Sequence, residues 1–213
     1  MLALNLDQRE DRERTLAAAK AGQTEAIEAL LRLYCRHLRI LAETQLDGRL
    51  KARVSPSDVV QETLFEAHHD IGQFRGSSEP EFLAWLRRIL ANNLARAFER
   101  HILAEKRDVH REVSIDDIGA KLDRSAARFH EFLVDQQATP SAVVDQGEQM
   151  LAVTCAMDAL PEDYRAVIVM RHLEGLSFAE VAARLGRTPG ACRMLWLRAI
   201  DQIRAQLSQE GWL

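Results

Sequence analysis

Residues 160–207 constrain the fold of this chain most, because they encode two short helices joined by a tight turn. Ser177, followed three positions later by Glu180, forms a capping box that predicts the start of a helix. Gly186 ends that helix, since glycine readily adopts the left-handed conformation at a helix end. Thr188 can then cap a second helix, which has a proline in its first turn. The segment therefore predicts a helix-turn-helix motif.

The second helix of this motif has one apolar face and one basic face. The apolar residues recur at helical spacing and should pack on the preceding helices. They are Cys192, Trp196, Ala199 and Ile203. The basic residues of the other face are Arg193, Arg198 and Arg204. A solvated surface helix is one interpretation of this pattern. The small residues Gly190 and Ala191 at the helix start, which can approach a major groove closely, favour contact with DNA.

Helical periodicity along the rest of the chain predicts an all-α protein with two small helical domains. The 213 residues are long enough for two hydrophobic cores. We expect one domain over residues 1–107 and the helix-turn-helix domain over residues 148–213. Residues 108–147 between them predict an acidic, solvated linker that retains only short helical pieces. It contains Asp116, Asp117, Asp123, Glu131, Asp135 and Asp145 among its acidic residues.

Composition limits the classes of function. The net charge of −4 argues against a protein that grips nucleic acid over its whole surface, so basic patches should be local and unaided DNA binding weak. The three cysteines lack the spacing of a zinc site and predict free, buried thiols in a reducing, cytoplasmic protein without a cofactor. We identify neither a membrane-spanning segment nor a secretion signal.

Two segments of the first domain stand out. Ser55 caps a helix over residues 55–71, on which an acidic and aromatic cluster should lie outside. Favourable interaction with the helix dipole is a sufficient reason for such a cluster, and protein binding is the other. A loop with two glycines follows, and in it Phe74 lies next to Arg75, where an unstacked base could dock. Trp85 in the next helix should belong to the core.

Several motifs occur in a fixed order along the chain. The first region contains Asp58-Val59-Val60-Gln61-Glu62-Thr63 with Phe65 after it, then Phe74-Arg75-Gly76, then Phe82, Trp85, Leu86 and Asn92. The second contains Leu160, Pro161, Tyr164 and Arg165, then Arg171, Glu174 and Gly175. Over roughly two thirds of the chain these motifs resemble the sigma factors of bacterial RNA polymerase. The specific resemblance is to the small extracytoplasmic-function type, which has only the second and fourth conserved regions.

The resemblance implies a polymerase-binding surface and a −10 surface in the first domain. The residues that would bind the clamp helices of the largest polymerase subunit are Asp58, Gln61, Glu62 and Phe65. The residues that would recognise the non-template strand of the −10 element are Phe74, Arg75, Gly76 and Asn92. Phosphates nearby would be held by Arg87, Arg88, Arg96 and Arg100. Capture of flipped bases needs a pocket, which a loop with an aromatic ring and a helix amide can supply.

The resemblance also implies that the helix-turn-helix reads the −35 element as duplex DNA. The residues expected in this site are Arg187, Thr188, Gly190, Arg193, Met194, Leu197 and Arg198. The same domain would rest on the flap of the second-largest polymerase subunit, and the linker would pass through the active-site cleft and RNA exit path. An anti-sigma factor or other inhibitor would hide the polymerase-binding faces.

The chain departs from the family pattern at particular positions. Arg96 stands where an acidic residue is frequent, and the loop from Phe74 to Phe82 is about two residues longer than the commonest form. Met194, Leu195 and Leu197 replace polar or basic residues of the reading helix. Contact there can be apolar, to thymine methyl groups, or these side chains can be buried against an inhibitory partner.

Two other classes of protein share some of these sequence features. A self-sufficient dimeric helix-turn-helix regulator would bind an operator without polymerase, but it would leave the motif from Asp58 to Phe65 without a role. An enzyme would need converging groups, and the consecutive residues His68, His69 and Asp70 point in different directions on a helix. We therefore expect no catalysis.

Overall fold

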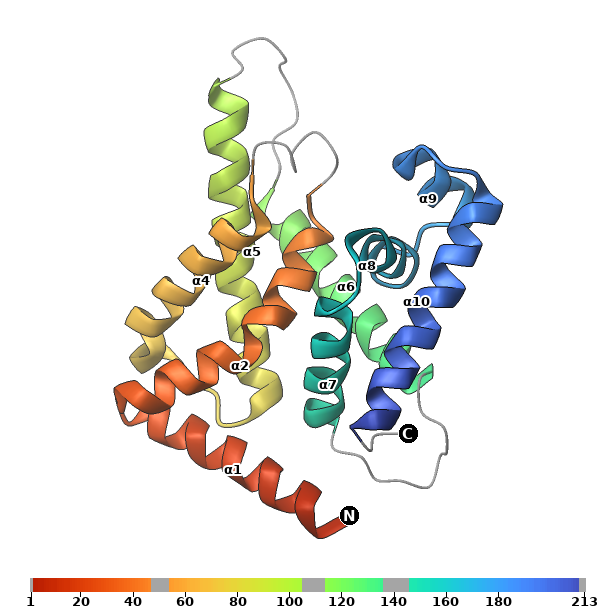
Figure 1. Cartoon of the computed structure of the whole chain (residues 1–213). Coiled ribbons are helices and arrows are strands. Elements are labelled where there is room, and N and C mark those ends of the chain that lie inside the picture. Colours follow the sequence, from red (N-terminus) through yellow and green to blue (C-terminus); the bar gives the residue numbers. More distant parts are fainter. Residues whose placement is uncertain (1, 47–53, 105–113, 136–145, 211–213) are drawn as a thin grey trace. The chain divides into compact units, whose positions relative to one another are not determined.

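The computed structural model describes residues 2–46, 54–104, 114–135 and 146–210 (Figure 1). Within these ranges all regular secondary structure is helical, which confirms the predicted all-α class. The chain forms two compact units, residues 1–123 and 124–213. The division falls inside helix α6 (Ile115–Asp135), so this helix contributes side chains to both units.

The first unit is a bundle in which successive helices pack on one another. Its elements are α1 (Leu2–Lys20), α2 (Thr24–Glu43), α4 (Pro56–Asp70), the 3₁₀ turn η1 (Ile71–Gln73) and α5 (Glu79–Ala104). Helix α2 packs on both α1 and α4, and α4 packs on α5. The core is formed by large buried side chains of α2 and α5, including Tyr34, Leu38, Leu41, Phe82, Leu86, Leu90 and Leu94.

Local hydrogen bonds determine where α4 and α5 begin. The Ser55 side chain accepts a hydrogen bond from the backbone N–H of Asp58, as the sequence predicts for a helix cap. At the start of α5, the Glu81 carboxylate accepts hydrogen bonds from the backbone N–H groups of Ser77 and Ser78 and from the Ser78 hydroxyl. These bonds, the one from Ser77 foremost, lower the pKa of Glu81. At neutral pH the Glu81 carboxylate is therefore charged and holds Ser77 and Ser78 at the start of α5.

Helix α6 differs from the short helical pieces expected in this region, because it is 21 residues long. Its apolar residues Ile118, Leu122, Phe129 and Phe132 are buried, and they recur at helical spacing. The acidic residues of the same helix whose exposure is described, Asp116, Asp117, Asp123 and Glu131, are exposed. The acidic composition thus belongs to the outer face of an amphipathic helix. The domain limits at residues 107 and 148 remain a prediction, and Asp145 lies outside the described residues.

The second unit is built around the last helix. Its elements after α6 are α7 (Gln146–Asp158), α8 (Glu162–Ile168), the π-helical turn η2 (Val169–Leu173), α9 (Phe178–Leu185) and α10 (Pro189–Gln209). Helix α10 packs on α7, α8 and α9. The core between these helices is formed by Val167, Val181, Ala182 and Cys192, with Phe178, Leu185, Leu195 and Trp196 packed against it.

The predicted helix-turn-helix forms as expected. Ser177 and Glu180 make both hydrogen bonds of the capping box, and Gly186 ends α9 in the left-handed conformation with φ of 62°. The Thr188 side chain then accepts a hydrogen bond from the backbone N–H of Ala191 at the start of α10. Each of these bonds joins residues that are neighbours in sequence, which is why sequence alone could identify them.

The remaining composition-based expectations concern thiols, metals and membranes. All three cysteines are free, as expected, but only Cys192 is buried, whereas Cys35 and Cys155 are partly exposed. Across the part of the chain that is described, no helix has the length and apolar character needed to cross a bilayer. The same residues contain no group of three or more His, Cys, Asp or Glu that could hold a metal ion.

Candidate nucleic-acid interface

The outer face of α4 combines acidic and apolar side chains. Asp58, Gln61 and Glu62 are exposed, and the Phe65 side chain is 79% exposed. Beside Phe65 lies an open groove between α2 and α4, lined by Glu28, Leu31, Arg32, Leu64, Phe65 and His68. A ring this exposed has little of its apolar surface removed from water, so it contributes little to the stability of the fold. The face has the apolar centre and charged surroundings typical of a protein-binding surface.

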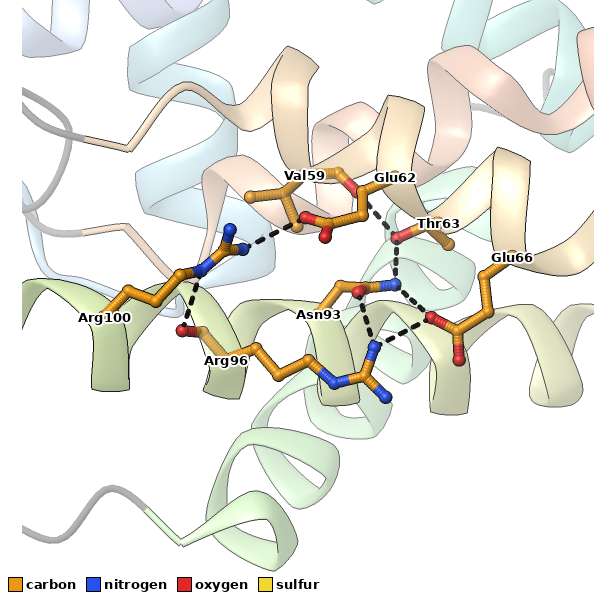
Figure 2. Close-up of polar contacts among 7 residues, drawn as sticks. All are labelled: Val59, Glu62, Thr63, Glu66, Asn93, Arg96 and Arg100. Carbon is orange, nitrogen blue, oxygen red and sulfur yellow. Dashed lines mark hydrogen bonds and ion pairs between the residues drawn. The ribbon is translucent and has the colours of Figure 1, made fainter.

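A polar network joins α4 to α5 (Figure 2). Arg100 pairs with Glu62 at 3.1 Å, and Arg96 pairs with Glu66 at 3.2 Å. Glu62 and Glu66 lie four residues apart on α4, and Arg96 and Arg100 lie four residues apart on α5. Successive turns of two antiparallel helices therefore face each other with opposite charge.

The centre of this network is the buried amide of Asn93. Its side-chain nitrogen donates to Glu66 at 3.1 Å and lies 3.5 Å from the Thr63 hydroxyl, which itself donates to the Val59 carbonyl. Its oxygen accepts from Arg96 at 3.4 Å. Sequence reasoning missed Thr63, Glu66 and Asn93 as a unit. The spacing of two acidic residues on one helix and two arginines on the next was the available signal.

The ring of Phe74 is placed differently from the prediction. We expected a ring available to a base, but Phe74 is only 5% exposed. Its centroid lies 5.5 Å from those of both Phe82 and Trp85, and Lys20 of α1 lies over the ring at 5.5 Å. Phe82 and Trp85 exclude water from the Phe74 ring, so this ring anchors the loop to the core. Among the other predicted −10 residues, Arg75 is exposed, and Gly76 and Asn92 are half-buried.

Gly76 is required by the position of Phe74. A Cβ atom at this residue would lie 2.5 Å from Cζ of the Phe74 ring and 2.8 Å from Cβ of Glu81. Lys20 also donates a hydrogen bond to the Gly76 carbonyl. The Phe-Arg-Gly motif is thus a packing unit, in which the glycine permits close approach of the ring and the arginine points outward.

The four arginines expected to hold phosphates near the −10 surface fall into different environments. Arg87 is only 21% exposed and pairs with Asp123 at 3.0 Å. Burial, and then the charge of Arg87, lower the pKa of His37 to about 3, so this core histidine is neutral. Arg87 therefore has a role within the fold. Arg88 is exposed, and Arg96 and Arg100 are exposed but engaged with the carboxylates of α4.

The predicted reading helix presents a basic face with two apolar side chains. Arg193, Met194, Leu197 and Arg198 are exposed, whereas Leu195 packs inward against the core. The Arg193 guanidinium lies over the Phe178 ring at 5.3 Å, which restrains this long side chain. Arg187 forms an ion pair with Asp163 of α8. Thr188 and Gly190 are exposed at the helix start, and no atom lies within 4 Å of a Cβ placed on Gly190.

Known proteins match this chain both over the helix-turn-helix and over most of its length. The family model Sigma-70, region 4 matches residues 150–203, which include the helix-turn-helix. The chain is 31% identical over 158 residues to the ECF RNA polymerase sigma-E factor of Escherichia coli K12, covering 72% of this chain and 76% of that protein. The chain belongs to the ECF sigma factors. The sigma-E factor of Salmonella typhimurium matches with the same identity and coverage. The ECF RNA polymerase sigma factor SigM of Mycobacterium tuberculosis is 29% identical over 196 residues, covering 91% of this chain and 81% of the relative.

Membership in this family confirms the function predicted from sequence. The protein is a sigma factor, and sigma factors direct transcription initiation by RNA polymerase. The self-sufficient dimeric regulator is not favoured by these comparisons. The residues matched by the family model, 150–203, lie within the second structural unit of this sigma factor, in which α9 and α10 form the helix-turn-helix.

The packing of Gly76 predicts a localised sensitivity in this sigma factor. Gly76→Ala should lower the free energy of unfolding by about 1–3 kcal/mol, because the new methyl group would press on a buried ring that is packed against Phe82, Trp85 and Lys20. Gly72→Ala is a matched control, since no atom lies within 4 Å of its Cβ position and its effect should stay within about 0.5 kcal/mol. Urea unfolding followed by circular dichroism measures both, and equal midpoints would contradict the packing argument.

The charge network predicts a coupling between α4 and α5. Glu66→Arg should destabilise the first unit, because it places two arginines together beside Asn93. Adding Arg96→Glu should recover part of the loss, with a coupling energy of about 0.5–1 kcal/mol. A double-mutant cycle by urea unfolding gives this value.

The exposed pair of Glu10 and Arg14, four residues apart on α1, is the control for this cycle. Its coupling should be smaller, near about 0.3–0.5 kcal/mol. A Glu66–Arg96 coupling no larger than that of the control would mean that the pair does not contribute to the register of the two helices.

Proposed function

We propose that the α4 face around Phe65 binds core RNA polymerase, through the clamp helices of its largest subunit. The observation that carries this proposal is the 79% exposure of Phe65 on a helix whose neighbouring side chains are acidic or polar. Aromatic side chains of this kind commonly dominate the binding energy of protein interfaces. Asp58, Gln61 and Glu62 would surround the aromatic anchor. Glu62 would then exchange its partner Arg100 for groups of the polymerase.

We further propose that the loop after η1 and the outer face of α5 bind the −10 element as single-stranded DNA. Arg75 and Arg88 are exposed and suit phosphate contacts, and Asn92 offers an amide that can hydrogen-bond to a base. Phe74 and Gly76 would hold the loop in shape from within. Arg96 and Arg100 can reach phosphates only in competition with Glu66 and Glu62, so their contribution would be smaller than their charge suggests.

The helix-turn-helix would bind the −35 element as duplex DNA. Helix α10 would enter the major groove with its open start at Thr188 and Gly190, and its basic residues Arg193 and Arg198 would contact phosphates or base edges. Arg187 would contribute from the turn, next to Asp163. The same unit would rest on the flap of the second-largest polymerase subunit, which places both units on one large partner.

Regulation would act on the polymerase-binding surface. An anti-sigma factor or other inhibitor that covers Phe65 would prevent docking, because this face has the only large apolar side chain of α4 that is exposed. The protein would act in the cytoplasm, where RNA polymerase works. Its contribution to transcription would be binding and strand capture, with the chemistry of RNA synthesis left to the polymerase.

Reconstituted transcription tests whether promoter recognition requires both this protein and core RNA polymerase. The purified protein is mixed with core RNA polymerase, and run-off transcripts from genomic promoter fragments are measured, with the free protein and the free core as controls. Transcripts that require both components would support polymerase-dependent promoter recognition. Tight operator binding by the protein alone, without a complex or a transcript, would support the dimeric regulator instead.

The polymerase-binding surface predicts a separation of stability and binding. Phe65→Ser should weaken binding to core polymerase at least tenfold and leave the unfolding midpoint nearly unchanged, because the ring is exposed in the free protein. Gln61→Ala with Glu62→Ala should also weaken binding. Leu33→Ser removes an apolar side chain that is 38% exposed on α2, outside the lining of the groove beside Phe65, and is the matched control. Equal affinity of Phe65→Ser and the parent protein, measured by fluorescence anisotropy, would remove Phe65 from the interface.

A further inference from the structure

The exposed face of α10 contains two large apolar side chains among its arginines. Met194 is 50% exposed and Leu197 is 41% exposed. They lie three residues apart and therefore share one face of the helix. Both follow the open helix start at Gly190, in the part of a reading helix that approaches base edges. Leu195 between them packs against the core, so the helix turns only Met194 and Leu197 of these three side chains toward solvent.

The charge around these side chains indicates the class of partner. Residues 186–200 contain Arg187, Arg193 and Arg198, and the first acidic residue after them is Asp201, which is exposed one turn beyond Leu197. This stretch is therefore net positive, whereas the chain as a whole carries 32 acidic and 28 basic residues. A polyanion therefore complements this face. The length and start of α10 fit a major groove, so duplex DNA is the polyanion that suits this face.

The chemistry of methionine and leucine limits what they can read in that groove. Neither side chain offers a strong hydrogen-bond donor or acceptor, so neither can distinguish bases by the donor and acceptor pattern of their edges. The one apolar group that a base pair presents in the major groove is the 5-methyl group of thymine. Arg193, held over Phe178, and Arg198 remain available for phosphates or guanine.

We propose that Met194 and Leu197 read thymine in the upstream promoter element by contact with its 5-methyl group. This inference rests on the proposed reading of the −35 element by α10. Specificity would then depend on methyl burial at one or two positions, in addition to hydrogen bonds from arginine. Removing one buried methyl group should weaken binding about three- to fourfold.

The experiment uses the sigma factor bound to core RNA polymerase. The holoenzyme selects duplexes from a pool that is randomised over the upstream element, and each thymine of the selected sequence is then replaced by uracil, one at a time. Uracil keeps the hydrogen-bonding edge of thymine and lacks only its methyl group. We expect uracil to weaken holoenzyme binding about three- to fourfold at one or two positions.

Variants of the chain show whether this effect arises at the two side chains. Met194→Ser or Leu197→Ser should bind the thymine and uracil duplexes equally at the affected position. Ile115→Ser, which removes a side chain as exposed as that of Met194, should retain the difference. Three results would overturn the proposal. They are a selected element without thymine, tolerance of uracil at every position, and the same uracil effect in the parent and both serine variants.

A separate variant distinguishes failure of this inference from failure of the proposed −35 site. Arg193→Ala with Arg198→Ala should abolish selection of any upstream sequence, whereas Arg14→Ala with Arg36→Ala, which removes two exposed arginines from the first unit, should not. Continued selection by the first double variant would refute −35 reading by α10. If serine at 194 and 197 weakens only the binding of an inhibitor protein, α10 reads DNA through its arginines and the apolar pair is a protein contact.

Discussion

The antiparallel packing of α4 on α5 is the constraint on which the first unit depends. It is fixed most strongly at Asn93, because a buried amide left without partners costs about 1–3 kcal/mol, more than an exposed ion pair contributes. The pairs Glu62–Arg100 and Glu66–Arg96 then align the outer edges of the same helices (Figure 2). This alignment of α4 with α5 therefore fixes the position of the Phe65 face relative to the proposed DNA face.

The same residue types serve the fold at some positions and remain available for partners at others. Arg87 is half-buried and pairs with Asp123, whereas Arg75, Arg88 and Arg198 are exposed. Aromatic rings divide in the same way, since Phe74 is buried against two other rings and Phe65 lies outside. Charge and size alone do not decide a role. The role of each side chain depends on whether a neighbouring helix places an opposite charge or an apolar surface beside it.

The departures from the family pattern acquire physical reasons in the structure. Arg96 stands where an acidic residue is frequent, and here it forms an ion pair with Glu66 across the helix pair. Met194 and Leu197 leave the core intact because both point outward, while Leu195 completes the packing beneath them. These differences therefore modify surfaces on a retained scaffold.

The sequence by itself determined the helical class, the starts of α4, α9 and α10, and the helix-turn-helix, because capping bonds join residues three positions apart. The order of its motifs also predicted the family. Tertiary structure alone decided that Phe74 is buried, that Arg87 belongs to the fold, and that Asn93 organises a network. Those outcomes depend on contacts between different elements, such as Phe74 with rings of α5, Asn93 with Glu66 at a separation of 27 residues, and Arg87 with Asp123 at a separation of 36. No local pattern encodes which distant side chain arrives beside them, since that follows from how whole helices pack.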